Sequence, residues 1–420
     1  MEDPAEDDTR VKSSPDHLLR AIAENKVDDF QAIVDAKADV NARSKMAGVT
    51  ALEMVAKSGS AEMCEILLEA KANPRTRDRQ KRTPLLQATI LGNAGVVTVL
   101  LGSGVGEERD INDDTALHLA AQRGKGKLVF LLGAQLGLYL DAANAKGQSP
   151  LHCALGNTPV NHDTVAALLY FKYRKLGEQR GGTVDLGMMM TDTHGQTVLH
   201  YAASTLLNEP GDTSLLAQIL ELSYLEDIRS VSATDDDGRT PLHIAALHDR
   251  YSFVQYLTKF VGDHAKGQKQ TVVGGALPTW VNNGDTKGLT ALHLAAISGS
   301  LQTLRLLVAI PGADVNVGRD TSGWPPIMHA AKNGHLGVIR ALLAARASLT
   351  PVDLNHLGST QNEVDVALGS GHVEVARALL QMQHSETTLA ARLTTLRERV
   401  GRVEHGKASA RGSCAACSMM

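Results

Sequence analysis

The sequence predicts an all-α fold, a repeat solenoid of about ten helix-turn-helix units with a C-terminal capping helix. Three observations predict it: a phrase of the form T-P-L-H that returns along the chain, a small residue two positions after it, and a later pair of leucines. The phrase is clearest in DTALHLAA (114–121), QSPLHCAL (148–155), QTVLHYAA (196–203), RTPLHIAA (239–246) and LTALHLAA (289–296).

The fourth position of the phrase sets the period. Its occupants are Leu19, Glu53, Leu86, His118, His152, His200, His243, His293, Met328 and Asp365. Successive occupants lie 32 to 37 residues apart, except in the middle of the chain, where three steps are 43 to 50 residues. Such a period is typical of repeat arrays, in which each unit packs only on its neighbours.

The stretch RTPLHIAALHDR (239–250) shows why each unit forms two helices. Thr240 is a natural N-cap, and Pro241 fits the first helical position, where its missing N–H costs nothing. A break at Asp249 separates two apolar helical faces, which are formed by Leu242, Ala245 and Ala246 and by Phe253, Val254 and Leu257. A helix pair this small buries its apolar face only by stacking on its neighbours.

These residues closely resemble the ankyrin repeat family, and the resemblance covers roughly residues 16–382. The best copies are 237–260, 288–318 and 323–347, whereas the end units, 16–43 and 358–382, are atypical. The resemblance implies a protein-recognition scaffold whose partner is not fixed by the fold.

The recurring histidines are His118, His152, His200, His243 and His293. One histidine per unit is spread along an array, whereas catalytic residues converge on one place. Leu86 and Met328 occupy the same position, which a ligand role would not allow. The family resemblance implies a structural role, with the ring bonding across the turns between units. Metal binding by a pair of them is the alternative. We expect no catalytic residue, metal or cofactor.

The composition limits the partners and the cellular compartment that we expect for this chain. The 420 residues carry a net charge of −4. No stretch of the sequence interleaves basic and aromatic residues, so we do not expect binding to nucleic acid. The four cysteines, Cys64, Cys153, Cys414 and Cys417, do not form a disulfide framework. The N-terminus has no apolar signal segment, and the longest apolar run (128–140) is too short to span a bilayer. We expect a cytoplasmic protein, with a nuclear location left open.

The predicted turns, or fingers, differ in charge. The turn RTRDRQKR (75–82) holds Arg75, Arg77, Arg79, Lys81 and Arg82, and the next turn, EERDINDD (107–114), is acidic. We expect these five basic residues to contact a partner protein of opposite pattern. The alternative is a solvated turn without a partner.

Three units are enlarged by insertions, near 172–190, 204–214 and 262–280. Long loops in compact arrays are often functional. These insertions could contact a partner, or they could be loops that the fold merely tolerates. We expect the first and third insertions on the finger side and the second at the opposite rim.

The two ends lie outside the array of 15–383. Residues 1–14 predict a disordered acidic segment, 384–404 an amphipathic capping helix, and 405–420 a disordered tail. Cys417 stands fourth from the end and resembles a prenylation signal, with Cys414 as a palmitoyl site. Membrane association is expected only if this tail is lipidated.

Asn41 and Asn316 match positions that can be hydroxylated in ankyrin proteins. The leading function is a non-catalytic, monomeric adaptor that binds another protein through its fingers, inner helices and insertions. A lipid-anchored membrane scaffold is the alternative, and an enzyme that uses the insertion loops is a remote one, because no catalytic motif is present.

Overall fold

The computed structural model describes residues 15–44, 48–106, 108–135, 140–178, 185–206, 210–267, 280–316, 321, 323–348 and 362–383. These ranges contain helices and turns but no strand, which confirms the predicted all-α repeat fold. The chain divides into two compact units, unit 1 (Met1–Asp236) and unit 2 (Asp237–Met420), and each is described by itself.

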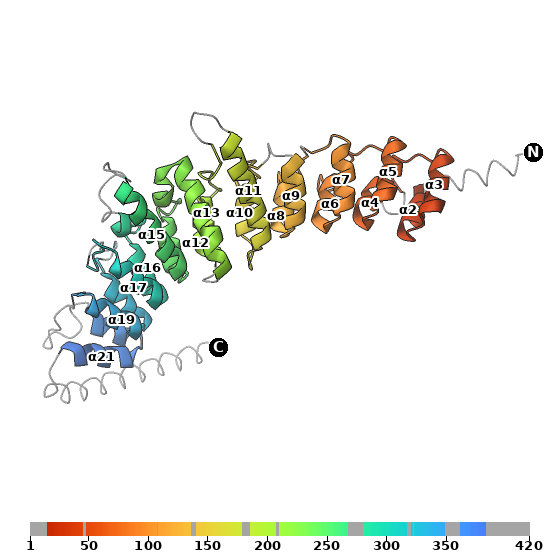
Figure 1. The fold of residues 1–420 in the computed structure, drawn as a ribbon. Helices are drawn as coiled ribbons and strands as arrows, with labels where there is room; N and C mark the ends of the chain where they lie inside the picture. The colour runs from red at the N-terminus through yellow and green to blue at the C-terminus, as the bar shows by residue number, and fades with distance from the viewer. Residues whose placement is uncertain are drawn as a thin grey trace, which may run out of the picture. The chain divides into compact units, whose positions relative to one another are not determined.

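Unit 1 is a stack of helix pairs that follow one another in chain order (Figure 1). The first helices of the pairs are α2 (Pro15–Ala23), α4 (Ala51–Ser58), α6 (Pro84–Leu91), α8 (Ala116–Gln122), α10 (Pro150–Leu155) and α12 (Val198–Thr205). The second helices are α3 (Val27–Asp35), α5 (Ala61–Glu69), α7 (Ala94–Gly102), α9 (Gly126–Gln135), α11 (His162–Glu178) and α13 (Pro210–Glu226), followed by the 3-10 helix η2 (Ile228–Ser232).

Unit 2 repeats the plan. Its first helices are α14 (Pro241–Leu247), α16 (Ala291–Ser298), α18 (Pro326–Asn333) and α20 (Glu363–Gly369). Its second helices are α15 (Tyr251–Gly267), α17 (Leu301–Ala309), α19 (Leu336–Ala344) and α21 (Val373–Gln383), and the 3-10 helix η3 (Trp280–Asn282) precedes α16. The segment that joins a second helix to the next first helix is called a finger below.

Capping residues fix where the first helices begin. Thr50, Thr83, Thr115 and Ser149 each accept a hydrogen bond from the backbone N–H three residues later, which satisfies a donor that the helix itself leaves unpaired. Pro84, Pro150 and Pro241 occupy the first helical position, as Pro241 was predicted to do.

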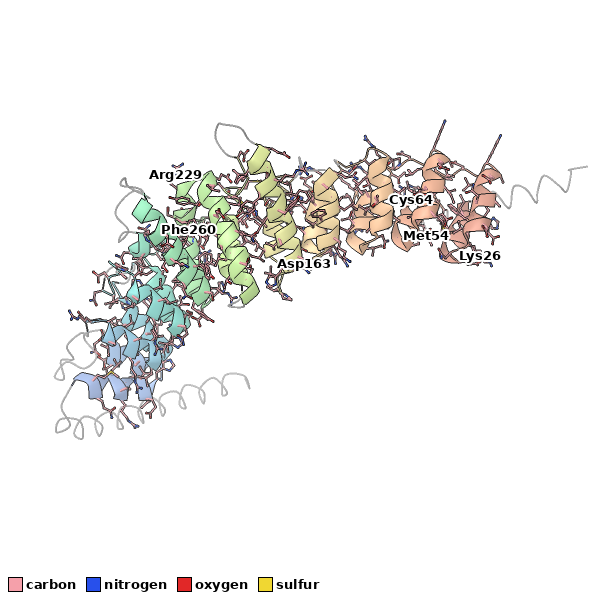
Figure 2. All side chains as sticks on the ribbon, in the orientation of Figure 1. Lys26, Met54, Cys64, Asp163, Arg229 and Phe260 are labelled. Carbon is pink, nitrogen blue, oxygen red and sulfur yellow. The ribbon has the colours of Figure 1, made fainter. Side chains whose placement is uncertain are left out.

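Burial explains why the pairs stack. First helices pack on first helices of the neighbouring repeats, and second helices pack on second helices. Buried residues therefore occupy most of a first helix and one face of a second helix; in α5 they are Met63, Cys64 and Leu67. Cys64 is labelled in Figure 2. Each repeat thus depends on its neighbours for the burial of its apolar surface.

Part of each predicted insertion forms helix instead of loop. α11, α13 and α15 each have 17 residues, whereas α5, α7, α17 and α19 have 9. Part of each insertion is therefore helical. In the second insertion Pro210 begins α13, where a proline costs no hydrogen bond.

Several predicted features lie outside the described residues. They are the acidic segment 1–14, the capping helix 384–404, the tail 405–420 with Cys414 and Cys417, and the insertion segments 179–184, 207–209 and 268–279.

Candidate protein-interaction surface

Three of the recurring histidines, His118, His243 and His293, bond to the turns on both sides of them. The Nδ1 atom of His118 accepts from the backbone N–H of Thr115 at 3.2 Å and lies 2.9 Å from the Thr115 hydroxyl. Its Nε2 atom lies 2.9 Å from the carbonyl oxygen of Gln148, at the end of the next finger. Because Nδ1 accepts, the proton of the neutral ring is on Nε2, which donates to this carbonyl.

Unit 2 contains the same arrangement twice. The Nε2 atom of His243 lies 3.1 Å from the carbonyl oxygen of Leu289, and that of His293 lies 3.0 Å from the carbonyl oxygen of Trp324. In unit 1, His152 and His200 each accept from the backbone N–H of their capping residue, at 3.2 and 3.1 Å. The Nε2 atom of His152 has no hydrogen-bond partner among the described residues. The rings of His118, His243 and His293 thus join helix starts to fingers, and the five rings do not converge on one place.

Burial sets the protonation of these rings. It is the largest cause that lowers the pKa of His118 and lowers that of His152 to about 4. Among the described residues, no group of three or more His, Cys, Asp or Glu side chains could hold a metal ion. The two described cysteines, Cys64 and Cys153, are buried, and burial raises the pKa of both thiols to about 12.

An acidic or amide side chain braces each of five described fingers. The Oδ1 atom of Asp78 accepts from the backbone N–H groups of Gln80 and Arg82, both at 2.8 Å. The same brace, to the second and fourth residues that follow, is made by Asp110, Asn144, Asp192 and Asp285. The braced turns present their tips in a defined conformation.

Backbone bonds link the finger tips to one another. In unit 1 the backbone N–H of Ile111 donates to the carbonyl of Gln80 at 3.0 Å, and that of Ala145 donates to the carbonyl of Asn112 at 2.9 Å. The tips in this part of the chain therefore form a continuous, hydrogen-bonded edge.

Arginine side chains form a second ladder along unit 1. Arg43 donates to the carbonyl of Arg77 at 2.8 Å, Arg77 donates to the carbonyl of Arg109 at 3.2 Å, and Arg109 donates to the carbonyl of Ala143 at 2.6 Å. Sequence reasoning missed this ladder, although three arginines recur in it at intervals of one repeat. The ladder joins fingers that are far apart in the sequence, so these arginine side chains help to hold the fold together.

The ladder divides the predicted basic turn into two groups. Arg77, although exposed, belongs to it, and Arg82 pairs with Asp78 at 3.1 Å, so both side chains already have partners in the array. Arg75 is exposed and lies 3.7 Å from Glu108, a loose contact. Arg79 and Lys81 are exposed, and neither has a carboxylate partner among the described residues.

The neighbouring turn is less acidic on its surface than the sequence predicted. Glu108, Asp110 and Asp114 are buried, at 8%, 7% and 4% exposure, and only Asp113 of the described acidic residues of this turn is exposed. The carboxylates are buried because they serve the fold: Asp114 accepts from Gln122 and Asn144, at 3.0 and 2.9 Å. Among the described acidic residues, only Asp113 therefore contributes to an acidic surface beside the basic turn.

An apolar side chain is exposed on the same turn. Ile111, at the tip of this turn, is 58% exposed, one of the most exposed large apolar side chains in the described part of the chain. Its backbone bond to Gln80 sets it beside the tip that carries Arg79 and Lys81. We call these three residues the finger patch.

The asparagines predicted to be modified bridge neighbouring turns. Asn41 accepts from the backbone N–H of Asn73 at 2.7 Å, and Asn316 accepts from that of Ser348 at 3.0 Å. Both side chains are exposed. Their hydroxylation stays a prediction, which intact-mass analysis for an added oxygen tests.

The described part of the first insertion is tied down by a buried cation. Lys172 on α11 is 1% exposed, and its ammonium donates to Asp141 and to the carbonyl of Leu186. Lys175 donates to the other oxygen of Asp141 at 2.6 Å. A buried ammonium requires such partners. These contacts therefore hold the segment around Leu186 against α11 and do not form an open site.

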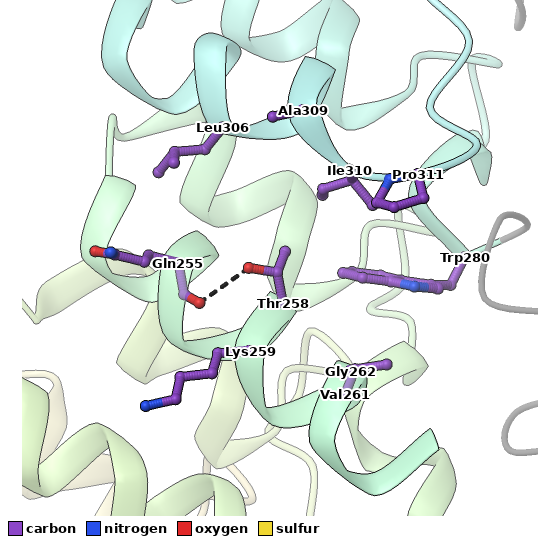
Figure 3. Close-up of a pocket in the computed structure, with 10 residues that line it drawn as sticks. All are labelled: Gln255, Thr258, Lys259, Val261, Gly262, Trp280, Leu306, Ala309, Ile310 and Pro311. Carbon is purple, nitrogen blue, oxygen red and sulfur yellow. Dashed lines mark hydrogen bonds between the residues drawn. The ribbon is translucent and has the colours of Figure 1, made fainter. Parts of the chain in front are cut away.

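Unit 2 has a hollow between its second helices α15 and α17. Figure 3 shows the indole of Trp280 along one side, with Ile310 and Pro311 above it and Lys259 at the rim. The hollow has a volume of about 490 Å³ and is mostly apolar. None of the five basic residues predicted to bind a partner lies in it, but Gly262 and Trp280, the two ends of the third insertion, do.

Comparisons with known proteins agree with the repeat pattern. A family model described as ankyrin repeats (3 copies) matches residues 18–109, 182–268, 209–319 and 270–353, which together make up more than half of the chain.

Within the described residues, no helix combines the length and the apolarity needed to cross a bilayer.

Individual relatives match over parts of their length. Tyrosine-protein kinase Shark of Drosophila melanogaster is 31% identical over 199 residues, 47% of this chain and 18% of the kinase. SMC5-SMC6 complex localization factor protein 1 of Homo sapiens is 37% identical over 95 residues, 23% of this chain and 9% of that protein. B-cell lymphoma 3 protein homolog of Mus musculus is 28% identical over 274 residues, 63% and 51%. The chain thus spans about half or less of each relative.

Proposed function

The chain belongs to the ankyrin repeat family, and from this premise we propose that it is a non-catalytic scaffold or adaptor that binds a partner protein through the fingers and first helices of unit 1. Repeats of this family generally mediate protein–protein interaction and are generally non-catalytic. Stacked repeats offer extended binding surfaces because each unit adds one finger and one first helix to the same side.

The observation that carries the proposal is the finger patch. Arg79 and Lys81 are exposed and have no described carboxylate partner, while Arg77 and Arg82 in the same turn are engaged in the fold. The chain therefore distinguishes basic residues that stabilise the finger from basic residues that remain available. Ile111 adds an apolar contact beside them.

This chemistry defines the partner. A protein surface with carboxylates around an apolar side chain would pair with both cations and cover Ile111. Cations at the edge of an interface mainly raise the association rate and set specificity, while an apolar centre contributes affinity. We place this interaction inside the cell, a setting supported by the unpaired thiols of Cys64 and Cys153.

The experiment compares captured proteins by quantitative cross-linking and mass spectrometry. The test variant is Arg79→Glu with Lys81→Glu, and the control is Arg123→Glu with Lys125→Glu, which makes the same charge change on the exposed turn between α8 and α9. We expect specific partners to fall at least about tenfold with the finger variant and to persist with the control.

A second variant separates charge from shape. Ile111→Ala leaves the charge unchanged and should weaken the same partners. A set of captured proteins that is identical for wild type and for the Arg79/Lys81 variant would contradict the proposal.

A further inference from the structure

The outer face of unit 2 has hollows on both sides of α17. The hollow between α15 and α17 is walled by Trp280, Leu306 and Ile310 (Figure 3). A second, of about 520 Å³, lies between α17 and α19 and is floored by Leu301, Val308 and Ala344. Both are open apolar depressions between parallel helices, and both belong to unit 2.

The hollows are bordered by cations. Arg305 and Arg340 line the second hollow, and Lys259 lines the first. All three are exposed, and none has a carboxylate partner among the described residues. Other arginines do: Arg20 and Arg174 pair with the glutamate four residues later, both at 2.9 Å, and Arg377 pairs with Glu374 at 3.1 Å.

The fold does not require these cations. Arg305 and Arg340 are the fifth residues of α17 and α19, and the fifth residues of α5, α7 and α9 are Glu65, Thr98 and Phe130. The same outer position thus accepts an acid, a hydroxyl or an aromatic ring. They are also the only charged residues in α17 and α19, and among the described side chains of α15 the one acid is Asp263.

We propose that this face, defined by Lys259, Trp280, Arg305, Arg340 and Ala344, docks an acidic amphipathic helix of a partner protein. Apolar side chains of the helix would enter the hollows, and its carboxylates would pair with the three cations. Helices recognised in this way present apolar anchors at intervals of three, four and seven residues. The small side chains of Ala309 and Ala344 allow a helix to approach closely.

Charge complementarity favours this occupant over others. A polyanion such as nucleic acid would meet the cations but leave the apolar floors uncovered, and an anionic bilayer would do the same unless it deformed into the hollows. This surface is separate from the finger patch, which lies in unit 1, so the proposal is independent of the function proposed above.

The test measures fluorescence anisotropy of a labelled synthetic helix of about 18 residues, with leucines at those intervals and glutamates beside them. A matched peptide has lysines in place of the glutamates. We expect wild type to bind the acidic peptide and not the basic one, more weakly as salt rises. Arg305→Glu with Arg340→Glu should weaken binding at least about tenfold.

Two further variants keep the result specific. Ala344→Phe fills the second hollow without a charge change and should also weaken binding, while circular dichroism checks that both variants fold. The finger variant Arg79→Glu with Lys81→Glu makes an equal charge change in unit 1 and should leave peptide binding unchanged. Its effect on captured partners tests the finger proposal separately.

Three outcomes would overturn the proposal. One is equal binding of the acidic peptide to wild type and to the Arg305/Arg340 variant, and another is no effect of Ala344→Phe. The third is that binding of anionic vesicles, duplex DNA or a second copy of the chain, followed by sedimentation, depends on Arg305 and Arg340 while binding of the acidic peptide does not.

Discussion

The imidazole Nε2 of His243 donates to the carbonyl of Leu289 across 3.1 Å, joining two repeats that are 46 residues apart in the chain. The ring is 1% exposed, and its Nδ1 accepts from the backbone of Thr240 at 3.1 Å. One side chain thus fixes both the start of its own helix and the end of the following finger.

Replacing His243 by alanine should lower the free energy of unfolding of unit 2 by about 1–3 kcal/mol, because a carbonyl loses its donor and a buried ring is removed. Urea denaturation followed by circular dichroism measures the change. His248→Ala is the control: this histidine is exposed, so we expect a change within about 0.5 kcal/mol. Equal effects of the two variants would contradict the structural role.

The buried histidines of unit 1 should make its stability depend on pH. Burial lowers the pKa of His152 from 6.5 to about 4, so between these values the unfolded chain binds more protons than the folded one. The free energy of unfolding should be highest above about pH 6.5 and fall as the pH falls through this window. His118 acts in the same direction.

Denaturation midpoints across the window measure this dependence, and His152→Gln should make it shallower because one of the titrating rings is gone. A dependence as steep in His152→Gln as in wild type would show that this ring is not responsible.

A glycine that ends a first helix should not tolerate a side chain. Gly299 has φ +79°, and a Cβ there would lie 2.7 Å from the imidazole of His335, which bonds to the carbonyl of Ile297. Gly299→Ala should lower the free energy of unfolding by about 1–3 kcal/mol. A Cβ at Gly262, within α15, would meet no neighbouring side chain within 4 Å among the described residues, so Gly262→Ala should be neutral or slightly stabilising. The opposite order of melting temperatures would contradict the account.

The basic turn should separate into stability and binding roles. Arg82→Ala breaks the pair with Asp78 and Arg77→Ala breaks the ladder, so each should lower the melting temperature of unit 1. Arg79→Ala and Lys81→Ala should not, because neither has a described partner. Differential scanning calorimetry makes the comparison, and four equal melting temperatures would remove the distinction.

The sequence predicted the features that depend on local chemistry. Thr240 and Pro241 identified the start of α14, since capping acts within a few residues. The start of α13 at Pro210 was missed, because the same residues also suit a turn.

Local sequence patterns could not predict the contacts between repeats. The burial of Asp114 and the separation of Arg77 from Arg79 follow from bonds to neighbouring fingers about one repeat away. The recurrence of Arg43, Arg77 and Arg109 was the available signal for the ladder. The exposure of Ile111 had none, because apolar residues are usually buried.

The central claim is that the exposed cations of a finger recognise a partner while the recurring histidines hold the repeats together. The most direct measurement compares partner capture and unfolding for Arg79→Glu with Lys81→Glu and for His118→Gln, at a temperature where both are folded. We predict that the finger variant keeps its stability and loses capture, and that His118→Gln loses stability and keeps capture. The reverse pattern would contradict the claim.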